Sequence, residues 1–97
     1  MPTYISLMNY TEQGIRDIKN GGKRATAAKK LLSSMGGKVK AIYLTMGSYD
    51  IVTIAEAPDD ETAAKFALTL GATGNVRTTT LKAFTEAEFR KIIASLP

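Results

Sequence analysis

Tyrosine, carboxylate, threonine and arginine side chains are the groups of this sequence that could bind or transform a polar ligand. Tyr49 and Asp50 follow Gly47-Ser48 between two short apolar runs, Val39–Met46 and Ile51–Ala57, which together predict an antiparallel hairpin. A phenol beside a carboxylate can orient a polar ligand, or transfer a proton if its pKa is shifted. Alternatively, Asp50 caps the turn and Tyr49 packs against a neighbouring subunit, because turn aspartates commonly bond to nearby backbone N–H groups.

A second group of candidates lies on the predicted strands. Tyr4, Tyr43 and Thr45 could line a pocket for a flat, partly apolar molecule, and Arg77 could meet an anionic ligand. The alternative is that the tyrosines and threonines form cross-strand pairs at an interface, while Arg77 is an ordinary surface residue. The residues predicted to bind a ligand are therefore Tyr4, Tyr43, Thr45, Tyr49, Asp50 and Arg77.

The composition excludes several kinds of chemistry. The chain has no cysteine and no histidine, so thiol nucleophiles, Ser-His-Asp triads, imidazole bases and ordinary zinc sites are absent. The acidic cluster Asp59-Asp60-Glu61 could hold a hard cation, but at a helix start it is better explained by compensation of the helix dipole. We predict no metal site and no cofactor, and the sequence does not specify a reaction.

The length of 97 residues, of which 44% are apolar, predicts one domain over residues 1–97. There is no apolar run long enough for a membrane span and no secretory pattern at the start, so we expect a cytoplasmic protein. Residues 16–40 carry lysine or arginine at eight positions against one acid, and residues 49–61 are acidic. These two segments are solvated helix faces, an anion-binding surface, or surfaces that meet between subunits.

Hydrophobic periodicity predicts strands at residues 3–10, 39–46, 51–57 and 76–84. Helices are expected over residues 12–19 and 23–35, from Pro58 to Gly71, and after a capping box that begins at Thr85. This order, with right-handed crossovers, predicts a ferredoxin-like βαββαβ fold with an extra C-terminal helix. Its four-stranded antiparallel sheet would carry helices on one face only.

The other face of that sheet would need a cover. The residues predicted to lie on this uncovered face are Tyr4, Ser6, Met8, Ala41, Tyr43, Thr45, Ile51, Thr53, Ala55, Thr78, Thr80 and Lys82. The set is neither lysine-rich nor densely aliphatic, as expected for a face that meets another sheet around a partly wet cavity. We therefore expect a second subunit to cover it, the alternative being an open, solvated sheet.

Several motifs follow one another along the chain in a specific order. The motifs are Gly14-Ile15-Arg16-Asp17-Ile18-Lys19, Gly36-Gly37-Lys38-Val39-Lys40-Ala41, Tyr43-Leu44-Thr45-Met46-Gly47-Ser48-Tyr49-Asp50, Glu56-Ala57-Pro58-Asp59-Asp60, Ala64-Lys65-Phe66-Ala67-Leu68, Gly74-Asn75-Val76-Arg77-Thr78 and Ala83-Phe84-Thr85. This ordered set resembles the GYD domain family, and the resemblance implies a dimeric α+β barrel. It implies no particular activity.

Three functions follow from these observations. The first is binding of a small, partly apolar molecule in a pocket between the sheet and a partner subunit. The second is a structural or sensory module that forms homodimers or larger homo-oligomers and has no catalytic activity. RNA binding is disfavoured, because RNA-recognition motifs of the same strand order stack bases on aromatic residues, and the third strand, Ile51–Ala57, has none.

Overall fold

The computed structural model describes all residues, 1–97, and contains a single four-stranded sheet. The strands are β1 (Thr3–Tyr10), β2 (Lys38–Leu44), β3 (Ile51–Glu56) and β4 (Val76–Ala83). The helices are α1 (Glu12–Arg16), a short 3₁₀ turn η1 (Ile18–Asn20), α2 (Gly21–Ser34), α3 (Asp60–Ala72) and α4 (Glu86–Ala94). This element order confirms the predicted ferredoxin-like arrangement with an extra C-terminal helix.

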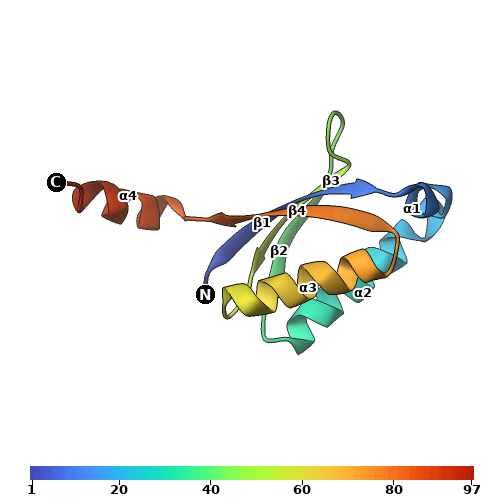
Figure 1. Ribbon diagram of the computed structural model, residues 1–97, viewed down its shortest axis with the longest axis horizontal. Helices are drawn as coiled ribbons and strands as arrows, with labels where there is room; N and C mark the ends of the chain where they lie inside the picture. The colour runs from blue at the N-terminus through green and yellow to red at the C-terminus, as the bar shows by residue number, and fades with distance from the viewer.

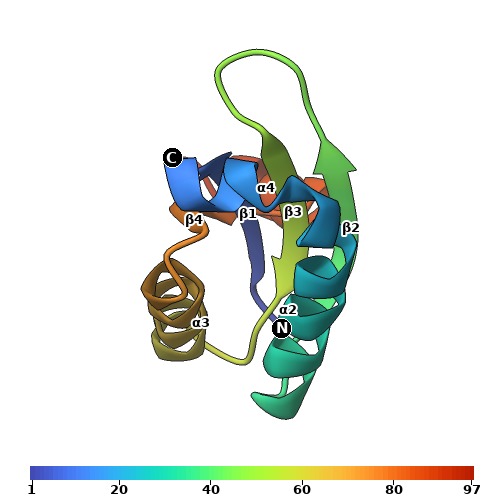
Figure 2. The ribbon, with the colours of Figure 1, turned by 90° about the vertical axis from the view of Figure 1, so that its right-hand side faces the viewer.

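The sheet is antiparallel throughout and has the order β2-β3-β1-β4. β1 and β3 therefore form its centre, and β2 and β4 form its edges. Helices α2 and α3 lie on the same face, where α2 packs on β2 and α3 packs on β4. Figure 2 shows these two helices on one side of the sheet, with no helix on the other side.

Local sequence signals explain where most elements begin and end. The side chains of Thr11 and Asp59 accept hydrogen bonds from backbone N–H groups in the first turns of α1 and α3. Thr85 and Glu88 form a complete capping box at the start of α4. Gly36, with a φ of 87°, ends α2 in the left-handed conformation that glycine adopts without strain.

The first helical region differs from the prediction. We expected one helix to residue 19 and a second from residue 23, whereas α1 ends at Arg16 and α2 already begins at Gly21. The turn η1 joins them, and the Asp17 carboxylate accepts hydrogen bonds from Asn20 and Arg24 across this turn. Gly21 and Gly22, which lie between the two predicted helices, are accommodated in the first turn of α2.

The predicted faces of three strands were wrong. Tyr4 and Met8 of β1 and Thr53 of β3 are buried beneath the helices, and the register places Lys82 of β4 opposite Tyr4. β1 is apolar on both sides, so alternation alone does not tell which side the helices cover. For β2 the prediction was correct for Ala41 and Tyr43, because a register shift between Val39 and Ala41 changes which residues share a face.

Helix α4 leaves the body of the molecule. It follows β4 and projects beyond the end of the sheet where β1 begins (Figure 1). Its large apolar residues Phe89, Ile92 and Ile93 are exposed, as is Leu96 after the helix ends. None of the helices is long and apolar enough to cross a membrane.

Candidate functional site

One face of the sheet carries no helix (Figure 2) and is an unpartnered surface built by the strands. The register aligns Ile5 of β1 with Ile54 of β3 and Leu81 of β4, and aligns Leu7 with Val52. We call this surface the helix-free face, and its apolar members are Ile5, Leu7, Ala41, Tyr43, Val52, Ile54 and Leu81. It is densely aliphatic, contrary to the prediction of a mixed tyrosine, methionine and threonine surface.

Every strand contributes to the helix-free face, and no other part of the chain covers it. Leu81 remains 47% exposed, although it lies beside Ile5 of the neighbouring strand β1. Continuous apolar patches of this kind on a soluble domain usually mark an interaction surface. An exposed single leucine would need no explanation, but a row that crosses all four strands does.

The six predicted ligand-binding residues fall into three separate groups. Tyr43 and Arg77 lie on the helix-free face but on opposite edge strands, as their pairings with Val52 and Asn9 show. Tyr4 lies on the opposite face, under the helices. The remaining residues, Thr45, Tyr49 and Asp50, belong to the connection between β2 and β3. The structure therefore does not gather the six residues into one pocket.

Asp50 joins the β2–β3 connection to the central strand β1 through two hydrogen bonds. Its carboxylate accepts a hydrogen bond of 2.9 Å from the backbone N–H of Tyr10, and its own N–H donates to the Met8 carbonyl. The base of the loop is closed by Thr45, whose N–H donates to the Asp50 carbonyl and whose hydroxyl donates to the Tyr49 carbonyl. These contacts give Asp50 a structural role, and its ligand-binding role stays a prediction.

Replacing Asp50 with alanine is expected to destabilise the fold by about 1–3 kcal/mol, because the Tyr10 N–H loses its acceptor. Asp50→Asn keeps a side-chain oxygen at the same position and should lose less than half as much. Urea denaturation followed by circular dichroism measures both changes. Equal losses in the two variants would show that the hydrogen bond to Tyr10 is not what stabilises the connection.

Tyr4 joins the sheet to the start of α3. Its hydroxyl donates a hydrogen bond to Asp60, whose carboxylate also lies 3.1 Å from the Lys82 ammonium. The pKa of Asp60 is lowered, first by the hydrogen bond from Tyr4 and then by the one from Lys82. Burial, followed by the hydrogen bond to Asp60, raises the pKa of Tyr4 to about 12. A phenol is protonated at neutral pH even at its ordinary pKa of 10.0, and the raised pKa makes Tyr4 still less suited to act as a base.

The raised pKa of Tyr4 predicts a loss of stability in alkali. Because the fold favours the neutral phenol, its contribution is complete below the unfolded value of 10.0 and is lost as the pH rises through about 12. Tyr4→Phe should cost about 1–2 kcal/mol at pH 7 and remove this part of the alkaline loss. The urea midpoints of the wild type and of Tyr4→Phe at pH 8 and pH 11 measure this loss of stability. The same alkaline loss in both proteins would contradict the assignment to Tyr4.

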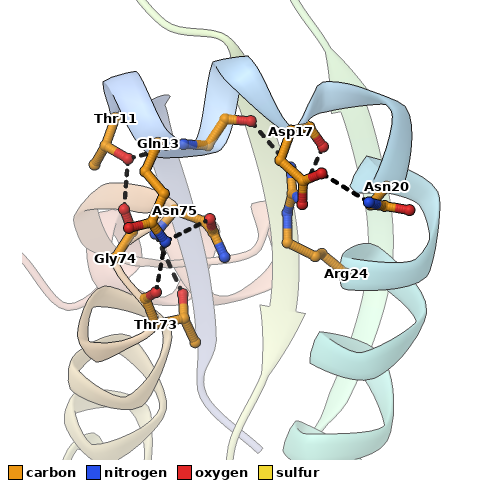
Figure 3. A network of polar contacts seen from close by, with 9 residues as sticks. Thr11, Gln13, Asp17, Asn20, Arg24, Thr73, Gly74 and Asn75 are labelled. Atoms are coloured by element: carbon orange, nitrogen blue, oxygen red, sulfur yellow. Dashed lines mark hydrogen bonds and ion pairs between the residues drawn. The ribbon is translucent and has the colours of Figure 1, made fainter.

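A polar network fixes α1 between the two large helices (Figure 3). On one side, the Thr11 N–H donates to the Asn75 carbonyl at 3.0 Å, and the Gln13 amide donates to Thr73 and Asn75 at the α3–β4 turn. On the other side, Arg24 of α2 donates to the Asp17 carboxylate at 2.7 Å and to the Gly14 carbonyl. α1 therefore sets the separation of α2 and α3 at this end of the molecule.

No cluster of three or more carboxylate, histidine or cysteine side chains is placed to hold a metal ion. The fold and the surfaces described above define a small ferredoxin-like α+β protein with an exposed apolar sheet face. The GYD domain model matches residues 4–93, and the chain belongs to the GYD domain family.

Among the proteins similar to this chain is one from Thermus thermophilus named "Glutamine synthetase and cystathionine beta-lyase binding protein". The two are 36% identical over 89 residues, which covers 91% of this chain and 94% of the relative. A crystal structure of a Thermus thermophilus protein is 25% identical with a TM-score of 0.55, covering 88% of this chain and 95% of that one. A hypothetical protein from Pyrococcus horikoshii, 22% identical, has the same fold with a TM-score of 0.57 over 88% and 92% of the two chains.

Proposed function

We propose that this chain is a protein-binding module whose single domain, residues 1–97, associates with a second copy of itself through the helix-free face. The observation that carries the proposal is the row of apolar side chains across all four strands, which nothing in the chain covers. Two such sheets can pack face to face about 10 Å apart, as in a dimeric α+β barrel. Burial of the row removes a large apolar area from water and so favours association.

Further exposed apolar groups support protein binding. The β2–β3 connection rises on the helix-free side of the sheet in Figure 2, and Met46 within it is 99% exposed. Helix α4 presents Phe89, Ile92 and Ile93 to solvent. By analogy with the relative that is named for binding two enzymes, we propose that the dimer also binds an enzyme partner, with the cytoplasm as its compartment.

Protein binding is better supported than the two other functions considered. On the helix-free face the central strands present Ile5, Leu7, Val52 and Ile54, whereas an RNA-recognition motif would present aromatic residues there. Of the six predicted ligand-binding residues, only Tyr43 and Arg77 could line a small-molecule pocket between this face and a partner subunit, and they lie on opposite edge strands. That pocket would take its remaining walls from the second copy.

The native mass tests the proposal. Light scattering on a column-purified sample, over a dilution series through the micromolar range, should give at least twice the chain mass of 10.4 kDa. A mass of 10.4 kDa at every concentration would overturn self-association through any face. The residue that carries the interface is then identified by substitution, as described in the Discussion.

A further inference from the structure

On the face opposite the proposed interface, α2 and α3 enclose an apolar cleft of about 240 Å³ above the central strands. Met8 and Thr53, both buried, form its floor. Leu31 of α2 and Phe66 and Leu70 of α3 form its sides. We infer that this cleft binds a small apolar carboxylic acid, with its chain between the helices and its carboxylate toward the Arg24 end.

The cleft is open because of the residues that line it and the way its helices are held. Ala25 and Ala28 line it on the α2 side, and such small side chains leave the space unfilled. The network around α1 ties Arg24 to Asp17 on one side, and Gln13 to the α3–β4 turn on the other. The helices cannot approach each other at this end without breaking these hydrogen bonds.

Most of the polar residues that line the cleft lie toward one of its ends, and the remainder of the lining is mainly apolar. Tyr10, Arg24 and Asn75 line this end. The Arg24 guanidinium makes three hydrogen bonds within the chain, two to Asp17 and one to Gly14, out of five N–H donors that the group possesses. Asn75 uses its side-chain oxygen to accept from Gln13, which leaves its NH₂ group for another acceptor. A ligand oxygen at this end would therefore meet several donors.

Charge favours an acid over a neutral molecule of the same shape. Asp17, the one acid among residues 16 to 40, forms an ion pair of 2.7 Å with Arg24, and the excess positive charge of this segment near Arg24 along the chain comes from Lys19 and Lys23. A carboxylate at a partly desolvated arginine forms a charge-assisted hydrogen bond, which is stronger than a neutral one. Since an apolar cavity of about 150 Å³ holds benzene, this cleft has room for about ten non-hydrogen atoms. Octanoate has that size and is a suitable probe.

The test titrates octanoate into the ¹⁵N-labelled full-length protein and follows backbone amide shifts. We expect saturation at sub-millimolar octanoate, with the largest shifts in α2, α3 and at Tyr10, and binding of 1-octanol about tenfold weaker. No saturation by about 5 mM, or shifts centred on the helix-free face, would overturn the inference. Equal affinity for 1-octanol would overturn the role of the Arg24 end.

Two variants with matched controls make the test specific. Ala28→Leu should fill the cleft and weaken octanoate at least tenfold, whereas Ala64→Leu, on the exposed side of α3, should bind as the wild type does. Tyr10→Phe removes only a hydroxyl and should weaken octanoate about threefold, while Tyr49→Phe should not. If Ala28→Leu fails to fold, the octanoate affinities of Tyr10→Phe and Tyr49→Phe test the inference: equal affinities would overturn it. Because the cleft lies opposite the helix-free face, the native mass reports separately on the proposed function.

Discussion

Replacing Leu81 with lysine is expected to convert the proposed dimer into a monomer. Leu81 is 47% exposed, so the substitution should cost little stability in the isolated chain. In a two-fold symmetric interface each substitution occurs twice, and two unpaired ammonium groups would be buried against apolar strands. We expect the association to weaken by at least ~100-fold, measured by sedimentation equilibrium.

The matched control is Leu68→Lys. Leu68 is 74% exposed on α3, which lies on the helix-covered side of the sheet, so the variant has the same change of charge in a different place. It should associate as the wild type does. If association weakens equally in both variants, the cause is the change in net charge and not the position of the lysine. Unchanged association of Leu81→Lys would show that the helix-free face is not the interface.

Among the glycines of this chain, Gly14 is expected to be the one whose replacement with alanine is most destabilising. An alanine Cβ at this position would overlap the carbonyl oxygen of Asn75, which itself accepts a hydrogen bond from the Thr11 N–H. Since the obstacle is backbone, α1 must move away from the α3–β4 turn and lose the network in Figure 3. We expect a loss of about 2–4 kcal/mol in the free energy of unfolding.

Gly22→Ala is the control for this prediction. An added Cβ at Gly22 meets nothing within 4 Å, and the residue lies in α2. Alanine has a higher helix propensity than glycine, so this variant should gain about 0.5–1 kcal/mol. Urea unfolding of both variants gives the comparison. A Gly14→Ala protein as stable as Gly22→Ala would contradict the close contact between α1 and Asn75.

The fold could be predicted because its signals are local. Thr85 with Glu88 marks the start of α4, Asp59 marks the start of α3, and Gly36 marks the end of α2. Short β-branched runs separated by Gly47 predict the hairpin. The crossover rules then leave few topologies for this order of elements.

The faces of the sheet could not be predicted from the same signals. Strand β1 is apolar on both sides, with Tyr4 and Met8 beneath the helices and Ile5 and Leu7 on the helix-free face. Alternation distinguishes the two sides only when one of them is polar. The register shift at Lys40 adds a second uncertainty, because one extra residue exchanges the faces of β2 relative to β3.

The cleft and the α1 network depend on contacts between distant parts of the chain. Gly14 of α1 contacts Asn75 in the α3–β4 turn, and Arg24 of α2 donates a hydrogen bond to Asp17, which precedes η1. The basic segment from residue 16 to 40 indicated an excess of charge there. Its pattern did not indicate that Arg24 lies at the end of an apolar cleft.

The central claim is that the helix-free faces of two copies meet, and methyl contacts between copies test it most directly. In a mixture of ¹³C-labelled and unlabelled protein, isotope-filtered nuclear Overhauser spectra report only pairs of protons in different copies. We predict intermolecular contacts among the methyl groups of Ile5, Ile54 and Leu81. Intermolecular contacts confined to α2 and α3, or none in a sample whose mass exceeds 10.4 kDa, would contradict the claim.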